Sequence, residues 1–146
     1  MATGAFSVLD DVRNVFADTS YFFALLCARD PQSVRAKQIA LELGRRDIRV
    51  ATSWEIVVET ATLLRYRLAF EPVKSFLTVV LPGIAVLAPT EEERLLACET
   101  FLRRSREMKL SLCDALSYVI VSKRLDWAPC LTFDKDLAAL GLTVVR

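Results

Sequence analysis

Short apolar segments that suit buried strands alternate with helical segments along most of the 146-residue chain, and this alternation most constrains its fold. The strands are predicted at residues 15–17, 48–51, 84–87, 129–133 and 142–145. Parallel strands need a crossover connection, and the crossovers here carry helical periodicity. The alternation therefore predicts an α/β protein with a mostly parallel central sheet and helices on both faces.

Capping residues mark where the helices between these strands are expected to begin. In chain order these residues are Asp30 with Pro31, Thr52 with Glu55, Thr90 with Glu93, and Ser111. The expected helices cover residues 21–28, 30–43, 53–67, 73–81, 90–109, 111–125 and 134–140. No repeat, linker or low-complexity tract interrupts residues 14–146, which predicts a single domain preceded by an N-terminal extension, residues 1–13.

The composition excludes several classes of chemistry. The chain has no His, and its 19 Lys and Arg nearly balance its 18 Asp and Glu, so the formal net charge is +1. A hydrophobic share of 53% is too high for a disordered chain. Without His, Ser-His-Asp and Cys-His catalysis and imidazole zinc sites are excluded. Any reaction must therefore use carboxylates, hydroxyls, thiols or cationic side chains.

The cysteines and the apolar content predict a cytoplasmic protein with buried thiols. No two of Cys27, Cys98, Cys113 and Cys130 form a CxxC pair, and their apolar neighbours predict buried, reduced side chains. The N-terminus lacks a signal-peptide pattern and no apolar run is long enough to span a membrane. The large apolar share also predicts a self-association face that includes Tyr21, Phe22 and Leu25 of the first helix.

Carboxylates occur where a parallel sheet places its ligands, in the crevice at the carboxyl ends of the strands. Asp18 directly follows the first predicted strand, and Asp134 follows the fourth. Asp114 falls in the first turn of the helix after Ser111, and Glu59 lies two turns into an earlier helix. Apolar residues surround Asp114 and Glu59 in sequence, so each is expected either to be buried or to line a cavity.

These acids allow a metal-dependent reaction, although each also has a simpler role open to it. Clusters of carboxylate oxygens suit hard cations such as Mg²⁺ or Mn²⁺, which activate water and stabilise charge on a phosphodiester. Alternatively, Asp18 could act only as a helix cap, Asp114 as a stabiliser of a helix dipole, and Glu59 as a solvated helix residue. Asp134 and Asp136 could be plain turn or cap residues.

Four short motifs resemble, in order and spacing, those of the PIN-domain family, and the subgroup that they resemble is the VapC-type toxins of bacterial toxin–antitoxin pairs. The resemblance covers roughly residues 14–146. The motifs are VFADTS around Asp18, SWEIVVETATLL around Glu59, LSLCDAL around Asp114, and LTFDKDL around Asp134 and Asp136.

The resemblance implies a Rossmann-like three-layer α/β/α sandwich and a Mg²⁺- or Mn²⁺-dependent endoribonuclease. It also implies a homodimer that a small antitoxin protein inhibits. Asp18, Glu59, Asp114 and Asp134 would form the acidic metal site, with Asp136 as an outer member. Ser20 and Thr132 would orient the first acid or a bound water. The RNA phosphates would contact nearby basic residues: Arg65, Arg67, Arg103, Arg104, Arg106 and Lys109.

The chain departs from the family pattern in two respects. It has no His after the first motif, but the family's metal ligands do not include that residue, and residues 1–13 form an extension to which no motif corresponds.

Three other interpretations are considered. A non-catalytic interaction module of the same fold, and a related nuclease that acts on DNA or structured RNA, remain alternatives. A receiver-like phosphoacceptor domain needs a pair of acids after strand one and an Asp after strand three, whereas this chain has Asp18 alone and Ala88-Pro89.

Overall fold

A computed structural model describes residues 4–146 and contains a five-stranded sheet in which every pairing is parallel. The strands are β1 (Asn14–Ala17), β2 (Arg49–Ser53), β3 (Ala85–Leu87), β4 (Cys130–Leu131) and β5 (Val144–Val145). Their order across the sheet is β3-β2-β1-β4-β5. The predicted parallel sheet is therefore confirmed, with shorter strands than expected at its β4–β5 edge.

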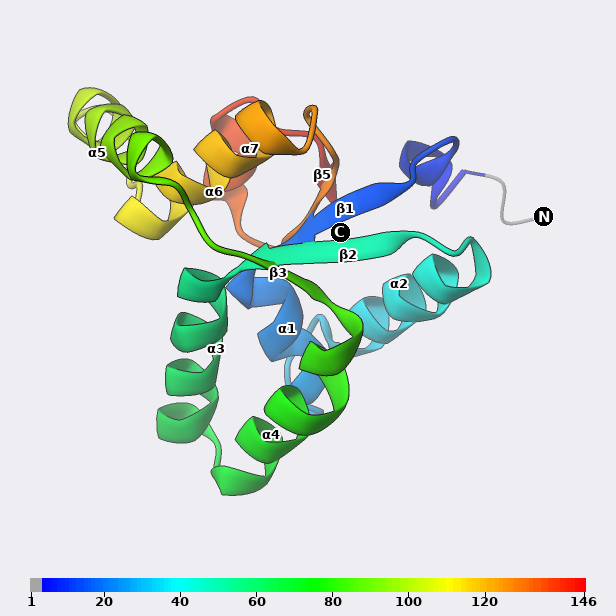
Figure 1. Cartoon of the computed structure of the whole chain (residues 1–146). Coiled ribbons are helices and arrows are strands. Elements are labelled where there is room, and N and C mark those ends of the chain that lie inside the picture. The colour runs from blue at the N-terminus through cyan, green and yellow to red at the C-terminus, as the bar shows by residue number, and fades with distance from the viewer. Residues whose placement is uncertain (1–3) are drawn as a thin grey trace.

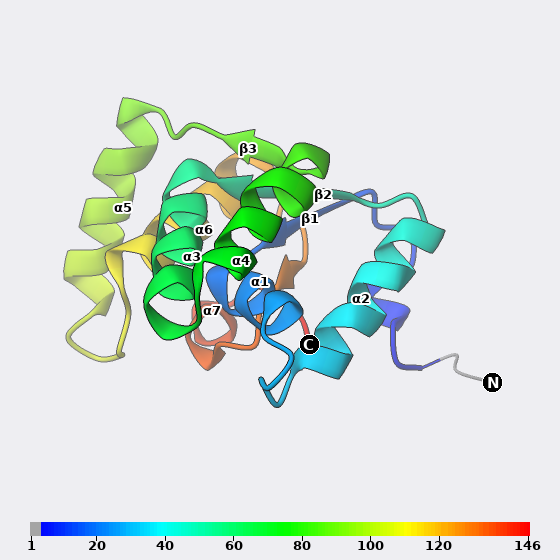
Figure 2. The ribbon, with the colours of Figure 1, turned by 90° about the horizontal axis from the view of Figure 1, so that it is seen from below.

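Helices cover both faces of this sheet and make an α/β/α sandwich, as predicted. In Figure 1, α1 to α4 lie below the sheet and α5, α6 and α7 lie above it, and the view from below in Figure 2 shows α1 to α4 in front. The helices are α1 (Thr19–Leu26), α2 (Ser33–Arg45), α3 (Trp54–Arg67), α4 (Phe70–Ser75), α5 (Glu91–Arg104), α6 (Leu112–Arg124) and α7 (Lys135–Ala139). A π-helical turn (Phe76–Val80) and a 3₁₀ turn (Leu81–Gly83) continue α4.

The strand order reverses at β1, and this reversal creates the crevice in which the acidic residues gather. The chain first runs outward from β1 to β2 and β3, and then returns to place β4 on the other side of β1. The carboxyl ends of β1 and β4 consequently meet, and the amide of Asp18 donates to the carbonyl oxygen of Leu131 at 3.1 Å. Ligands of open parallel sheets bind at such a switch point.

Two of the four predicted caps are confirmed, and the two at Asp30 and Thr52 are wrong. Thr90 with Glu93 forms a full capping box at the start of α5, and Ser111 caps α6. The expected cap at Thr52 is instead made by Ser53, whose Oγ accepts from the amide of Ile56 at 3.3 Å. Strand β2 continues two residues further than expected, to Ser53, so Thr52 belongs to the strand and donates to the carbonyl oxygen of Ala17 in β1 at 2.8 Å.

Three helix boundaries also differ from the prediction. Asp30 does not begin α2, because its Oδ1 accepts from the amide of Gln32 at 2.8 Å and makes a turn; the helix then starts at Ser33 and runs through Gly44. The helix expected at residues 73–81 begins earlier, at Phe70. It continues first as the wider π-helical turn and then as the tighter 3₁₀ turn. The helix expected to reach residue 109 ends at Arg104.

The first helix cannot provide the self-association face predicted for it. Tyr21 is 3% exposed and Phe22 is fully buried, while Leu25 is partly buried. Phe22 packs on Phe76, with ring centroids 5.1 Å apart. The helical pattern of α1 is apolar on nearly all sides, and local pattern alone does not show which side meets the sheet.

The thiol prediction holds for two of the four cysteines. Cys27 and Cys130 are buried, Cys113 is partly buried, and Cys98 is exposed on α5. All four thiols are free. Within residues 4–146, no helix is long and apolar enough to cross a membrane.

Part of the N-terminal extension packs against the domain. A 3₁₀ turn (Ser7–Leu9) places Leu9 in the hydrophobic core, where it is 1% exposed.

We expect Leu9→Ala to lower the free energy of unfolding by about 2–4 kcal/mol, because it leaves a cavity in a packed site. Urea unfolding measures this, with the exposed neighbour variant Ser7→Ala as the control. Equal free energies of unfolding for the two variants would show that the packing of Leu9 does not stabilise the domain.

Candidate active site

All five acids that the sequence suggested for one site line a single cavity of about 440 Å³ at the switch point; we call it the acid cavity. Its carboxylates are Asp18, Glu59, Asp114, Asp134 and Asp136. Its other walls are Thr19, Ser20, Leu63, Lys109, Leu110 and Ser111. These residues come from the start of α1 with its cap, from α3, from the start of α6 with the segment before it, and from the segment after β4. Only the folded sheet brings together carboxylates as far apart in sequence as Asp18 and Asp134.

Asp18 is the buried centre of the acid cavity, and two hydroxyl groups hold one of its oxygens. Ser20 Oγ donates to Asp18 Oδ2 at 3.1 Å, and Thr132 Oγ1 donates to the same oxygen at 3.0 Å. Asp18 is 5% exposed and Thr132 is fully buried. Both hydroxyls bind Oδ2, so neither of them occupies the other carboxylate oxygen, Oδ1.

The same two hydroxyls also fix the segment that carries Asp134. Ser20 Oγ accepts from the amide of Phe133 at 2.9 Å, and Thr132 Oγ1 accepts from the amide of Asp134 at 3.0 Å. Each hydroxyl therefore links the first acid to the backbone that positions the fourth. The carboxylate of Asp134 in turn caps α7, because its Oδ1 accepts from the amide of Asp136 at 3.0 Å.

Asp114 stabilises the start of a helix and also lines the acid cavity, two roles that the sequence analysis gave as alternatives. Its Oδ2 accepts from the amide of Ser111 at 3.0 Å, while its own amide donates to Ser111 Oγ at 3.0 Å. Burial raises the pKa of Asp114, its bonds with Ser111 lower it, and the charges of Asp134 and Glu59 raise it further. The four-residue cap thus presents a carboxylate to the cavity in a fixed direction.

Glu59 reaches the acid cavity from the middle of α3 and is itself exposed. It also contacts Cys113 of α6, and burial together with the Glu59 carboxylate raises the pKa of that thiol. Cys113 is therefore a neutral thiol at physiological pH. It stands between the acid cavity and the apolar groove described below.

The carboxylates repel one another, and the burial of Asp18 makes this repulsion costly. Burial raises the pKa of Asp18 to about 6; the Thr132 hydrogen bond opposes this shift and the charge of Asp114 adds to it. Partial burial and the charges of Asp134 and Asp114 raise the pKa of Asp136, whereas Lys109 lowers it. A cation bound between these groups would remove both penalties.

The donor set fits a hard divalent cation, although the side chains do not form a closed shell. Within residues 4–146, no three Cys, Asp or Glu side chains stand close enough together to hold an ion as they are placed. The cavity nevertheless offers only carboxylate and hydroxyl oxygens as its charged and polar acceptors, which are the ligands that Mg²⁺ and Mn²⁺ prefer.

The structure separates the basic residues that sequence reasoning had grouped together. Lys109 lines the acid cavity, and Arg67 lines a second cavity beside it. The other candidates line neither of these cavities: Arg65, Arg103, Arg104 and Arg106. Arg103 and Arg104 belong to the last turn of α5, which packs on α6. Charge in the sequence could identify basic clusters, but not which of them face the acids.

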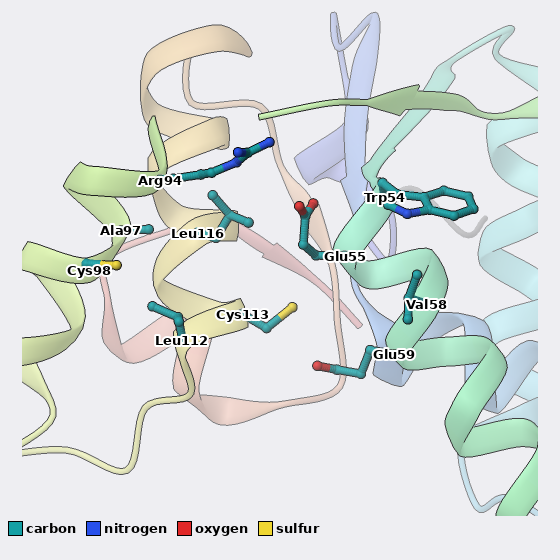
Figure 3. A pocket seen from close by; sticks show the side chains of 10 residues that line it. All are labelled: Trp54, Glu55, Val58, Glu59, Arg94, Ala97, Cys98, Leu112, Cys113 and Leu116. Atoms are coloured by element: carbon teal, nitrogen blue, oxygen red, sulfur yellow. The ribbon is translucent and has the colours of Figure 1, made fainter. Parts of the chain in front are cut away.

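An apolar groove of about 610 Å³ between α3, α5 and α6 lies next to the acid cavity, and sequence reasoning missed it (Figure 3). Its lining residues are Trp54, Glu55, Val58, Glu59, Arg94, Ala97, Cys98, Leu112, Cys113 and Leu116. The exposed fractions of Trp54, Val58 and Leu112 are 55%, 48% and 50%. The sequence feature that could have indicated the groove is the pair of apolar residues Trp54 and Val58, four positions apart. They lie on a helix whose opposite side is also apolar.

One carboxylate in this groove has no partner. Oε2 of Glu55 is buried without a hydrogen-bond partner among residues 4–146. Figure 3 shows Glu55 on α3 and Arg94 on α5 extending toward each other from opposite walls, and no ion pair joins them. Burying an unpaired polar atom is costly, so the groove is electrostatically incomplete in a single chain.

Comparison with known proteins identifies the family to which this site belongs. The PIN domain profile matches residues 15–142, and the chain therefore belongs to the PIN domain family. Within that family it is similar to VapC20 of Mycobacterium tuberculosis, described as a toxin that cleaves the sarcin–ricin loop. The two share 28% identity over 88% of this chain and 96% of that chain, with a TM-score of 0.75.

Two further solved structures share the fold at lower identity. FitAcB of Neisseria gonorrhoeae is 15% identical, with a TM-score of 0.66 over 90% of this chain and 96% of that chain. VapBC2 of Rickettsia felis, solved with a DNA fragment from its promoter, is 12% identical, with a TM-score of 0.63 over the same shares. A comparison with curated protein sequences finds no match.

The raised pKa of Asp18 predicts how the stability of the metal-free protein depends on pH. Its pKa is about 6 when folded against an ordinary value of 3.8, so the folded state binds the proton more tightly. The stabilisation from this proton is fully present below about pH 4 and is lost as the pH rises through 6, by about 2–3 kcal/mol. Thermal or urea unfolding between pH 4.5 and 7.5 measures this decrease in the wild type relative to Asp18→Asn.

The asparagine variant is the matched control, because its side-chain oxygen can still accept the two hydroxyl bonds while it has no proton to lose. We expect the wild-type curve to fall relative to the variant as the pH rises. Mg²⁺ at pH 7.5 should then stabilise the wild type more than the variant. Parallel curves for the two proteins would contradict the assigned pKa.

Proposed function

We propose that this protein is a metal-dependent endoribonuclease that hydrolyses RNA phosphodiester bonds and acts as the toxin of a toxin–antitoxin pair. The observation that carries the proposal is the acid cavity, in which Asp18, Glu59, Asp114 and Asp134 converge from four parts of the chain. Membership of the PIN family and similarity to a VapC toxin support the same activity, because PIN nucleases use divalent metal ions.

Each residue of the acid cavity has a distinct task in this mechanism. Asp18, Glu59, Asp114 and Asp134 would hold Mg²⁺ or Mn²⁺, with Asp136 as an outer ligand. The ion supplies Lewis-acid stabilisation of the phosphodiester and lowers the pKa of a water. Ser20 and Thr132 hold the Asp18 carboxylate in one orientation, so that its free oxygen faces a fixed direction. Lys109 contributes a positive charge beside Asp136, where an RNA phosphate would enter.

Proton transfer is assigned to Glu59. It is exposed and lines the cavity from α3, whereas one oxygen of Asp18 and one of Asp114 accept hydrogen bonds that hold each carboxylate within the fold. An exposed carboxylate that no cap holds in place can turn to accept the proton of the attacking water. Attack in line with the leaving oxygen would give a 5′-phosphate and a 3′-hydroxyl.

A small antitoxin and cellular RNA are the proposed partners, and the cytoplasm is the proposed location. VapC20 is described as a toxin, and the resemblance of the motifs to VapC-type toxins of toxin–antitoxin pairs supports an antitoxin partner for this chain. A non-catalytic interaction module is less consistent with the structure. A module that only binds partners has no need of several carboxylates held together against their repulsion.

Cleavage of an RNA pool tests the proposed activity. We expect products with Mg²⁺ or Mn²⁺ and none in excess EDTA, and we expect Glu59→Gln to lower the cleavage rate by at least a hundredfold. Glu107→Gln makes the same change at an exposed position outside the acid cavity and should leave the rate unchanged. Gel electrophoresis of end-labelled RNA measures the rates. Activity that persists in EDTA would refute the mechanism, and cleavage of DNA alone would favour the related nuclease.

The protein is also proposed to be a homodimer, with the apolar groove as its interface. The α5 helix presents Leu95 and Leu102, 61% and 69% exposed, on one side and Arg94 beside them. Placed in the groove of a second copy, this helix would bury its leucines against Trp54 and bring Arg94 to the unpaired Glu55. A two-fold arrangement would repeat the contact, so that Glu55 and Arg94 of each copy meet their opposite charges on the other.

A charge exchange tests this dimer. Glu55→Arg and Arg94→Glu should each yield a monomer, because each places like charges across the interface, whereas an equal mixture of the two should form a heterodimer. Light scattering after size-exclusion chromatography at micromolar concentration measures the mass. The proposed interface is wrong if both single variants remain dimeric.

A further inference from the structure

A second cavity continues from the acid cavity along the surface. This side cavity has a volume of about 640 Å³ and lies between α1, the α1–α2 turn, α3 and the start of α7. It shares Ser20, Leu63, Asp134 and Asp136 with the acid cavity. The residues found in the side cavity alone are Phe23, Asp30, Pro31, Gln32, Arg67, Phe133 and Lys135.

Three parts of the chain line both cavities: α1, α3 and the segment after β4. On α3, Glu59, Leu63 and Arg67 follow one another at four-residue spacing and therefore share a helix face. Glu59 belongs to the acid cavity, Leu63 to both, and Arg67 to the side cavity. A chain of nucleotides whose phosphate lies at the acids would therefore meet Leu63 and Arg67 next.

On the remaining walls, polar residues that line both cavities lie next to aromatic residues that line the side cavity alone. Ser20 of α1 is followed one turn later by Phe23, and Asp134 is preceded by Phe133, whose amide donates to Ser20 Oγ at 2.9 Å. That hydrogen bond fixes the backbone of Phe133 to the element that carries Phe23. Both rings are partly buried, so their positions are set by packing while part of each ring faces the cavity.

We propose that the side cavity binds the base of the nucleotide next to the scissile phosphate, in single-stranded RNA, and so determines where the enzyme cleaves. This inference rests on the proposed function. An aromatic wall with an adjacent guanidinium is the surface on which unpaired bases stack, and stacking is available only when the base is outside a duplex. The volume falls within the range of small-ligand pockets.

Charged and amide groups around the rim complete the chemistry expected of a nucleotide site. Arg67 and Lys135 are exposed cations that can contact the flanking phosphate. Gln32 is exposed at the α1–α2 turn, which Asp30 stabilises by accepting the Gln32 amide at 2.8 Å. The Gln32 side-chain amide is therefore available to form hydrogen bonds with the edge of a base.

Cleavage of substrates that lack one base tests the proposal. After the cleavage site has been mapped in a long RNA, we would synthesise a short single-stranded RNA around it and remove the base at each flanking position in turn. For the wild type, one abasic position should lower kcat/KM about tenfold. In Arg67→Ala and Phe133→Leu, the intact substrate should be cleaved more slowly, and the same abasic change should add little further loss.

Arg65→Ala is the matched control, because Arg65 is exposed on the same helix but does not line the side cavity. It should keep the full abasic penalty, whatever it does to general RNA affinity. If the penalty is equally large in Arg67→Ala, in Phe133→Leu and in the wild type, the base binds elsewhere and the proposal is wrong. In that outcome, cleavage by the wild type still supports the proposed function.

A binding measurement that needs no cleavage separates the two proposals. Nucleoside 5′-monophosphates, titrated without divalent metal, should shift the NMR signals of the Gln32 side-chain amide and the Phe133 backbone amide. Ribose 5-phosphate should leave those signals unchanged, because it has no base. Such shifts in a protein that cleaves no RNA would keep the nucleotide site and refute the nuclease. Signals that no nucleotide moves would overturn the base-binding proposal, and a protein partner would then be the remaining occupant.

Discussion

The interaction on which the site depends is the pair of hydroxyl bonds that Ser20 and Thr132 donate to one oxygen of Asp18. Asp18 follows β1 and Thr132 follows β4, so these bonds join the two strands at the point where the sheet reverses its order. The same hydroxyls accept backbone amides from Phe133 and Asp134. A buried carboxylate, the fourth acid and one wall of the side cavity are therefore positioned by a single polar cluster.

Helix α3 connects the three recesses of the surface. Its first turn places Trp54 and Glu55 in the apolar groove, its middle places Glu59 in the acid cavity, and its last turn places Arg67 in the side cavity. A small change in the position of this helix would alter all three together. Thr60 Oγ1 holds it to α1 through a 3.4 Å hydrogen bond to Thr19 Oγ1, directly beside Asp18.

Electrostatics unites these features. The acid cavity concentrates negative charge around a carboxylate whose pKa burial has raised to about 6, while Lys109, Lys135 and Arg67 stand at its margins. A cation at the centre and phosphates at the margins would satisfy both sets of charges. The apolar groove also holds an unbalanced charge, because one buried oxygen of Glu55 has no partner in the part of the chain that the structure describes, and Arg94 lies across the groove from it.

The sequence by itself determined the parallel α/β class, the Thr90 and Ser111 caps, and the positions of Asp18 and Asp134 after strands, because each depends on residues within a few positions of one another. Tertiary structure decided the rest. The Thr132 bond to Asp18 spans 114 residues and exists only because β4 lies beside β1. Likewise, which side of α1 is buried and which arginines face the acids depend on packing between elements, and a local pattern carries no record of that packing.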